Sequence, residues 1–328
     1  MNPNQLRKLL SVAFKRGQRV LIKGSPGIGK SDIVEQAAKD LEFALQISHP
    51  SVSDPTDYKG MPAVLANGKA EFLPFGDLNK LIETKEPLIA FLDDLGQAPP
   101  AVQAAVMQLI QARRVNGHRI SDKVVFCAAT NDTTHMAGVS GLLEPVKSRW
   151  DTIVELDVKV DDWCEWAFDH DMPPELVAFI RFRPDLLNNF KPTREIKNSP
   201  CPRTVAAVGR WLNCGVKDYD VIAGAAGEGF ATELVAFLKL YAEMPNLDEI
   251  LMNPDSSPVP TQPATKYAVT CGLARKCTPE NIERVYRYAQ RLEKEFEVCL
   301  VRDAVRINKQ NQTTRTFIAW ATKNAGIL

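Results

Sequence analysis

One short segment near the amino terminus, VLIKGSPGIGKS, constrains this chain more than any other. An apolar run leads into a glycine-rich turn, where Gly24, Gly29, Lys30 and Ser31 fill the fixed positions of the pattern G-x-x-x-x-G-K followed by Ser or Thr. A helical pattern follows over residues 30–41. A strand, a glycine-rich loop and a helix in this order predict a loop that wraps a polyphosphate.

The chemistry of such a loop gives each part a role. Glycines let successive backbone N–H groups turn towards phosphate oxygens, and the amino end of the following helix adds partial positive charge. We expect Lys30 to reach the β and γ phosphates and the Ser31 hydroxyl to bind Mg²⁺. The residues predicted to bind nucleotide are Gly24, Ser25, Pro26, Gly27, Ile28, Gly29, Lys30 and Ser31.

The fold class follows from the order of the apolar patterns. Up to residue 160, short apolar runs alternate with helical patterns, which favours a parallel sheet flanked by helices. The expected strands are 20–23, 44–47, 87–92, 123–129 and 152–156. Beyond residue 160, helical periodicity predicts an all-helical part. The expected helices there include 161–170, 174–182, 203–213, 233–244 and 279–307.

Two of these five expected strands lead directly into polar residues. The run PLIAFLDD ends in Asp93 and Asp94, and KVVFCAATN ends in Asn131. Carboxyl ends of parallel strands meet at one edge of a sheet, so Asp93 is placed to hold Mg²⁺ and Asp94 to act as a general base on water. Asn131 is placed to orient that water, although Asp and Asn at strand ends also suit turns and caps.

Composition sets the limits on other functions. The 328 residues suggest about two domains, and 40 Lys and Arg against 40 Asp and Glu give no strong electrostatic hold on nucleic acid. No apolar stretch is long enough to span a bilayer, and we expect a cytoplasmic protein without membrane association. The seven cysteines form no CxxC pair, so we expect buried reduced thiols rather than a structural metal.

Taken together, these motifs resemble the AAA+ ATPases, and within them the MoxR-like group of the helix-2-insert clade, over most of residues 1–250. The segment SDPTDYKGMPAV, continuing to NGKAEFLPFGDL, resembles the hairpin that this clade inserts, here at about residues 50–75. LDDLGQAPPAVQAAVMQLI resembles its acidic strand and Pro-Pro helix. GLLEPVKSRWD is similar to the helix end that carries an arginine finger, here Arg149, and CPRT to the second-sensor position, here Arg203.

The resemblance implies a P-loop NTPase core with a five-stranded parallel sheet over residues 1–158 and an all-helical lid over residues 159–252. A Pro-rich linker at 253–265, NPDSSPVPTQPAT, and a helical extension at 266–328 complete the expected chain.

The same resemblance implies an ATP hydrolase that converts ATP and water to ADP and phosphate with Mg²⁺. Ser31 and Asp93 would hold the metal, Asp94 and Asn131 would position water, and Arg149 and Arg203 would sense or stabilise the γ phosphate. MoxR-like proteins form rings, usually hexamers, with ATP between protomers, and act in a chaperone-like way on other proteins. Their partner often carries a von Willebrand factor A domain, which this chain lacks, so we expect a separate partner.

One departure from the family bears on the rate. The family usually has Glu where Asp94 stands, and the shorter side chain puts the carboxylate about 1.5 Å further from the water, a displacement that can cost on the order of 100-fold. Two alternatives to the partner-remodelling ATPase therefore stay open. The first is a slow ATP-gated binding switch. The second is a DNA-handling ring, suggested by basic residues of one hairpin, although we do not favour nucleic acid binding. These residues are Arg113, Arg114, His118, Arg119 and Lys123.

Overall fold

The computed structural model describes residues 1–131, 141–193 and 195–326. The chain divides into two compact units, each described here by itself. The first comprises Met1–Lys159 with a short segment that starts at Lys191, and the second comprises Val160–Phe190 with the residues from Glu195 onward. None of the helices in the described ranges is both long and apolar enough to cross a lipid bilayer.

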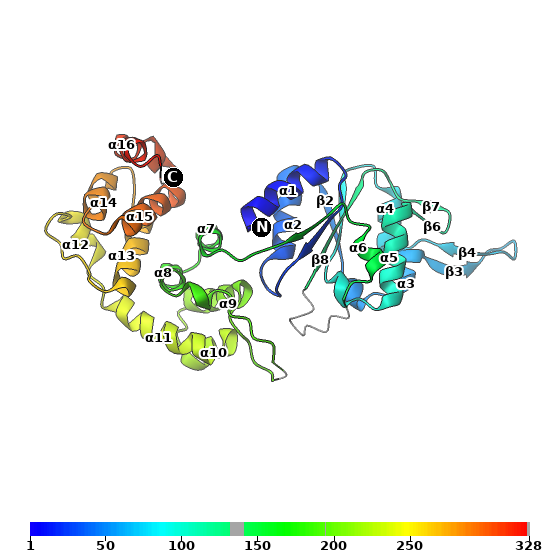
Figure 1. Cartoon of the computed structure of the whole chain (residues 1–328), viewed down its shortest axis with the longest axis horizontal. Coiled ribbons are helices and arrows are strands. Elements are labelled where there is room, and N and C mark those ends of the chain that lie inside the picture. Colours follow the sequence, from blue (N-terminus) through cyan, green and yellow to red (C-terminus); the bar gives the residue numbers. More distant parts are fainter. Residues whose placement is uncertain (132–140, 194, 327–328) are drawn as a thin grey trace. The chain divides into compact units, whose positions relative to one another are not determined.

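The first unit contains a five-stranded parallel sheet in the order β2-β5-β8-β1-β9 (Figure 1). Its strands are β1 (Val20–Lys23), β2 (Ala44–Ser48), β5 (Leu88–Leu92), β8 (Val124–Thr130) and β9 (Thr152–Glu155). All five strands lie within one residue of the predicted bounds, because each combines a short apolar run with clear flanking breaks. The predicted α/β core with a five-stranded parallel sheet is confirmed.

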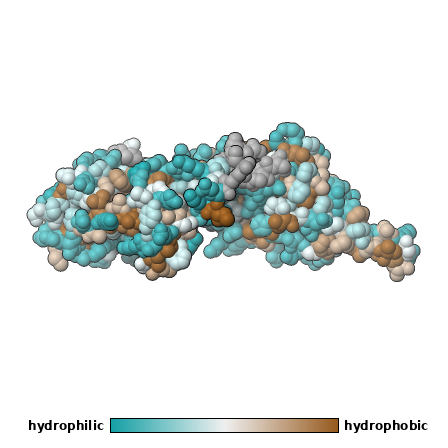
Figure 2. All heavy atoms as spheres, turned by 90° about the horizontal axis from the view of Figure 1, so that it is seen from below, coloured by the Kyte–Doolittle hydropathy of each residue, from teal (hydrophilic) through white to brown (hydrophobic). Residues whose placement is uncertain are grey.

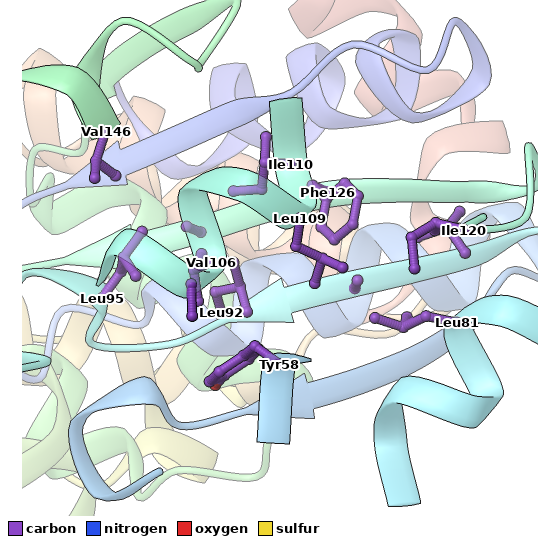
Figure 3. Packing of buried hydrophobic residues seen from close by; sticks show 14 of the residues in the cluster. Tyr58, Leu81, Leu92, Leu95, Val106, Leu109, Ile110, Ile120, Phe126 and Val146 are labelled. Atoms are coloured by element: carbon purple, nitrogen blue, oxygen red, sulfur yellow. The ribbon is translucent and has the colours of Figure 1, made fainter. Parts of the chain in front are cut away.

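Helices cover both faces of this sheet (Figure 1). The helices of the unit are α1 (Pro3–Lys15), α2 (Lys30–Leu41), α3 (Pro55–Lys59), α4 (Gly76–Glu83), α5 (Pro100–Ala112) and α6 (Glu144–Lys147). Strand side chains alternate between the faces. Val20 and Ile22 pack with α1 and α2, whereas Leu21 packs with the cluster that includes Leu109 of α5 and Val146 of α6 (Figure 3).

Two small hairpins extend the unit beyond the sheet. The predicted insert contains η1 (Pro50–Val52), α3 and the hairpin β3 (Met61–Val64) and β4 (Ala70–Leu73), which projects from the unit (Figure 1). The second hairpin pairs β6 (Arg114–Val115) with β7 (His118–Arg119). Its central residues Asn116 and Gly117 have φ of 48° and 88°, as the tight Asn-Gly turn requires.

The second unit is helical. Its α-helices are α7 (Val160–Asp169), α8 (Pro174–Phe182), α9 (Pro202–Asn213), α10 (Tyr219–Ala226), α11 (Glu228–Ala242), α12 (Leu247–Met252), α13 (Pro263–Lys276), α14 (Ile282–Ala289), α15 (Lys294–Ile307) and α16 (Arg315–Lys323). Short 3-10 turns lie at η2 (Leu95–Gln97) in the first unit and at η4 (Pro184–Leu186) and η5 (Lys309–Thr313) in the second. The predicted helical character of this half is confirmed.

The single helix predicted over residues 279–307 is wrong. The chain forms α14 and α15 instead, with Glu293 in extended conformation between them. This break lets Leu292 pack in the same cluster as Tyr288 and Phe296, and lets Arg291 donate to the Pro254 carbonyl oxygen at 2.6 Å. Tertiary packing therefore overrides a helical pattern that contains neither Gly nor Pro after Pro279.

The Pro-rich segment 253–265 is held to its surroundings at several points. The Tyr288 hydroxyl donates to the Pro258 carbonyl oxygen at 2.8 Å, and the Ser257 hydroxyl, which is buried, donates to the Asn253 carbonyl oxygen at 2.7 Å. Helix α13 follows it and packs on both α8 and α15. The division of this half into a lid, a linker and an extension stays a prediction.

Candidate functional site

The glycine-rich loop joins β1 to α2 at the carboxyl edge of the sheet. Gly27 and Gly29 have φ of 73° and 89°, in the left-handed region that glycine adopts readily. Helix α2 begins at Lys30, as predicted, and no side chain caps its amino end. The first N–H groups of α2 therefore leave a positively polarised end at the loop, which suits an anion.

Lys30 is the buried centre of this loop, with 7% of its surface exposed. Its Nζ donates to the carbonyl oxygens of Gly24 and Ser25, at 3.0 and 2.9 Å, and to Oδ1 of Asn131 at 2.7 Å. A buried ammonium group needs such acceptors, because an uncompensated charge in the interior is costly. The loop carbonyls and Asn131 thus hold the Lys30 ammonium group where the motif needs a cation.

A second contact joins the loop to the acidic strand end. The Ser31 hydroxyl donates to Oδ2 of Asp93 at 2.6 Å, and the backbone N–H of Asp94 donates to Oδ1 of Asp93 at 3.0 Å. Hydroxyl and carboxylate oxygens are the ligands that Mg²⁺ prefers, usually together with phosphate oxygens and water. The pair Ser31 and Asp93 therefore has the donor chemistry of the predicted metal site.

Asp94 and Asn131 also lie together. Asn131 Nδ2 donates to Oδ1 of Asp94 at 3.0 Å, so Asn131 bridges Lys30 and Asp94. Asp94 has φ 55° and ψ 36°, a left-handed conformation that Asp and Asn tolerate better than other non-glycine residues. This backbone conformation ends β5 abruptly and starts η2. Lys30, Ser31, Asp93, Asp94 and Asn131 thus form one hydrogen-bonded group, which we call the strand-edge network.

Burial, rather than a charged neighbour, sets the pKa shifts next to this network. Cys127, in β8 behind the strand ends, is fully buried, and burial raises the pKa of its thiol. Burial also raises the pKa of Tyr58, whose hydroxyl shares a hydrogen bond of 2.6 Å with Ser48. Both groups are therefore neutral at physiological pH and serve as packing beneath the site.

Arg149 does not belong to the strand-edge network. It follows α6 and precedes β9, where the N–H groups of Asp151 and Thr152 donate to the Arg19 carbonyl oxygen just before β1. This is the amino edge of the sheet, opposite the glycine-rich loop. The Arg149 guanidinium donates through Nη1 to the Ser148 hydroxyl at 3.1 Å, and its buried Nε has no hydrogen-bond partner among the described residues.

Arg203 lies in the second unit. It is the second residue of α9 and is exposed. The turn that precedes it is well defined, since the Thr204 hydroxyl accepts from the Cys201 N–H at 2.8 Å. The predicted role of Arg203 at the γ phosphate stays a prediction.

Sequence reasoning missed one buried polar residue of this unit. Gln103 in the first turn of α5 is fully buried, and its carboxamide makes three hydrogen bonds to backbone groups. The signal was available, because Gln103 lies on the same helical stripe as Val106 and Ile110, where an apolar residue is the norm.

Comparison with known proteins finds a family model that matches part of the chain. Residues 19–150 match the family model described as the AAA domain of the dynein-related subfamily. No curated protein matches the chain.

Solved structures with a similar chain path are distant in sequence. The chain is similar to the RuvB Holliday junction branch migration motor of Thermotoga maritima, with 16% identity, 83% of this chain and 80% of that chain covered, and a TM-score of 0.41. It is also similar to NtrX of Brucella abortus, solved in complex with ATP, with 12% identity, coverage of 99% and 68%, and a TM-score of 0.46. The parallel sheet with its P-loop has the AAA+ fold.

Proposed function

We propose that this chain is a MoxR-like AAA+ ATPase that hydrolyses ATP in an oligomeric ring, usually a hexamer in this group, and so remodels or activates a partner protein. The single observation that carries the ATPase proposal is the strand-edge network. It brings the loop lysine, the hydroxyl and carboxylate for a metal ion, and a second carboxylate with its amide partner to one edge of the sheet.

Each member of the network has a task in this reaction. The loop N–H groups and Lys30 bind the β and γ phosphates, which requires Lys30 to exchange part of its present contacts for phosphate oxygens. Ser31 and Asp93 would hold Mg²⁺, which neutralises charge on the phosphates when bound. Asp94 accepts a proton from the attacking water, and Asn131 fixes the direction of the Asp94 carboxylate.

The same contact supports activity despite the Asp at this position. The hydrogen bond from Asn131 and the left-handed backbone together restrict the Asp94 carboxylate to one place. A restricted base loses less orientational freedom in the reaction, which offsets part of the effect of the shorter side chain. We propose slow but real turnover.

Arg149 acts on the ATP of the neighbouring protomer in this account. Strand β1 has four residues, so at 3.3 Å per residue its two ends lie about 13 Å apart. The glycine-rich loop follows the carboxyl end of β1, whereas Arg149 lies near the amino end. A neighbour in a ring could present its own phosphates to this edge. A guanidinium there stabilises charge that develops on the transferred phosphoryl group.

The projecting hairpin supports a protein partner. Its side chains Met61, Val64, Phe72 and Leu73 are 40–76% exposed, and hydrophobic atoms gather on the hairpin at the right-hand end of Figure 2. An exposed apolar cluster on a projecting element is typical of a protein interaction site. We propose that the hairpin contacts the client or a separate partner bearing a von Willebrand factor A domain.

The basic hairpin gives little support to a DNA-handling ring. Arg113 donates to the carbonyl oxygens of Ser121 and Val124 at 2.5 and 3.0 Å and is only partly exposed. Arg119 forms an ion pair with Asp122, and the His118 ring shares a hydrogen bond with the Phe72 carbonyl oxygen at 3.2 Å. These three side chains already have protein partners that compete with phosphates.

The ATP-gated binding switch is the second candidate, and Asp94 is the residue that favours it. The variant Asp94→Asn separates the two functions, because it removes the base and leaves the phosphate loop intact. A switch keeps its ATP-dependent partner binding in this variant, whereas a remodelling ATPase loses its effect on the partner.

Phosphate release from ATP and Mg²⁺ by the purified chain tests the enzymatic proposal. We expect wild-type turnover, loss of both ATP binding and turnover in Lys30→Ala, and unchanged values in Arg16→Ala, an exposed cation at the end of α1. A wild-type chain that neither binds nor hydrolyses ATP would overturn the proposal, as would Lys30→Ala with wild-type turnover.

A further inference from the structure

The Gln103 side chain connects two segments that carry different parts of the reaction. Its Nε2 donates to the carbonyl oxygen of Ala98 and to that of Gly141, each at 3.0 Å, and its Oε1 accepts from the N–H of Leu143 at 3.0 Å. Both amide hydrogens and the amide oxygen are thus bonded to backbone. A fully buried carboxamide used in this way fixes the separation of the chain segments that it joins.

On one side, Gln103 holds the segment that starts at Asp94. Asp94 precedes η2, and the N–H of Gln97 donates to the Asp94 carbonyl oxygen at 2.9 Å. Ala98 ends this turn, and its N–H donates to the Leu95 carbonyl oxygen at 3.2 Å. Leu95 is fully buried in the cluster shown in Figure 3. A displacement of Asp94 therefore reaches Gln103 through one short turn.

On the other side, Gln103 holds the start of α6. Leu143 is the residue before the helix, and its carbonyl oxygen accepts from the N–H groups of Val146 and Lys147 at 2.9 and 3.2 Å. Arg149 follows directly, with its N–H donating to the Val146 carbonyl oxygen at 3.2 Å. Only one turn of helix separates the Gln103 contact from the predicted arginine finger.

The strand-edge network holds the Asp94 end of this connection. Lys30 donates to Asn131, and Asn131 donates to Asp94. The left-handed conformation of Asp94 costs free energy and persists only while its neighbours impose it.

We propose that Gln103 is a positioning residue that ties Arg149 to the segment carrying Asp94 and so fixes the guanidinium that one protomer presents to the next. This inference rests on the proposed function, in which Arg149 completes the site of a neighbouring protomer. Gln103 touches neither the nucleotide nor the water and acts only through the two segments.

The test separates the two halves of a site into different chains. Arg149→Ala supplies an intact phosphate loop without a finger, and Lys30→Ala supplies an intact finger without a working loop. According to the proposed function, each variant is inactive alone. A mixed ring regains turnover at each interface where an Arg149→Ala chain binds ATP and the neighbouring Lys30→Ala chain, the finger donor, supplies the guanidinium. Gln103→Met is then introduced only into the Lys30→Ala chain, so it can affect the recovered turnover only through the finger.

We expect the Gln103→Met donor to lower the recovered kcat on the order of 10-fold while KM for ATP stays constant, because the loop that binds ATP is unchanged. The control donor carries Leu109→Ala in the Lys30→Ala chain, which creates a cavity in the same helix six residues further on. It should support turnover within about 2-fold of the plain donor, which carries Lys30→Ala alone. Co-sedimentation of the two chains confirms that each donor enters the ring.

Equal recovered kcat with the plain and the Gln103→Met donor would overturn the proposal, as would an equal loss with Leu109→Ala. If Gln103→Met does not assemble, Gln103→Glu serves instead, because it keeps the acceptor for Leu143 and removes both donors. A loss of recovered kcat is expected there too, because the buried carboxyl group faces the carbonyl oxygens of Ala98 and Gly141, and no loss would overturn the proposal. Failure of the proposed function would give a different result, because Lys30→Ala mixed with Arg149→Ala would then show no turnover.

Discussion

At the scale of single residues, the strand-edge network joins side chains that lie far apart in the sequence. Asn131 is the residue on which it depends, because its amide uses the oxygen for Lys30 and the nitrogen for Asp94. An Asp in this place would repel Asp94, and a Leu would leave the buried ammonium of Lys30 short of an acceptor. Asn is thus the side chain that suits a cation on one side and a carboxylate on the other.

Asp94 is where turnover and binding can be separated. We expect Asp94→Asn to lower kcat by about 100-fold to 10,000-fold, the usual range for loss of a general base, with ATP affinity within about 3-fold of wild type. Asn also tolerates the left-handed backbone at this position. Asp94→Glu should retain turnover, and Asp122→Asn, an exposed carboxylate on the basic hairpin, is the control. Wild-type turnover by Asp94→Asn would exclude the assigned role.

The thiols give a prediction about pH. Burial raises the pKa of Cys164 and Cys271 to about 12, and Cys214 alone among the cysteines is exposed. At pH 8 a thiol with such a pKa is thiolate in only about one part in 10,000, so iodoacetamide should modify one thiol per native chain rapidly. Mass spectrometry should find it on Cys214, and Cys214→Ser should abolish the fast phase. Rapid modification of Cys271 would contradict the packing of α13.

The same shifts affect stability in a definite direction. The unfolded thiols release protons above about pH 9, whereas the folded Cys164 and Cys271 keep them to about pH 12. Their contribution to the free energy of unfolding is therefore complete below pH 9 and is lost as the pH rises from 9 towards 12.

Sequence reasoning placed the strand-edge network because its members follow strands or begin a helix, and parallel strands bring such positions to one edge. It did not place Gln103, whose partners are backbone groups from residues 98 to 143 along the chain. Backbone partners have no side-chain signature, so only the fold reveals them. The same reason hides the contacts between Arg291 and Pro254.

At the scale of elements, apolar runs predicted all five strands, while the second unit shows what such patterns omit. Helix α13 has buried residues on all its faces because it packs between α8 and α15. It therefore lacks the one-sided apolar stripe that identifies a helix from its sequence. The break between α14 and α15 was missed for a related reason, since distant contacts impose it.

A buried ion pair joins two of these helices. Arg181 of α8 and Asp303 of α15 are 9% and 7% exposed, and Arg181 Nη2 donates to Oδ1 of Asp303 at 2.8 Å. Burial alone would lower the pKa of Arg181, but the Asp303 carboxylate more than offsets this and the pKa stays above its ordinary value. The guanidinium is therefore charged and depends on its partner.

We expect Asp303→Ala to lower the free energy of unfolding by about 3–5 kcal/mol, because it leaves a buried cation without a counter-charge. The double variant Arg181→Met with Asp303→Leu removes both charges and should recover most of that loss. Urea denaturation followed by circular dichroism measures both. Stability unchanged in Asp303→Ala, or a double variant as unstable as the single one, would contradict the assigned role of the pair.

At the scale of the whole molecule, the two groups that the proposed function needs lie at opposite edges of the sheet. The phosphate loop lies at the carboxyl edge and Arg149 lies beyond the amino edge, so a site that needs both would be completed by two chains. A head-to-tail contact of this kind closes into a ring when the rotation between protomers is suitable. Assembly would then be a condition for hydrolysis rather than a consequence of it.

Turnover of Lys30→Ala and Arg149→Ala mixed in varying proportion tests whether two chains together complete one site. Each variant alone should be inactive, and the mixture should reach a maximum at equal amounts of about one quarter of the wild-type rate, since random order places a finger donor after a loop donor at one interface in four. Arg149→Ala that is fully active alone, or co-assembled mixtures that recover no turnover at any ratio, would contradict it.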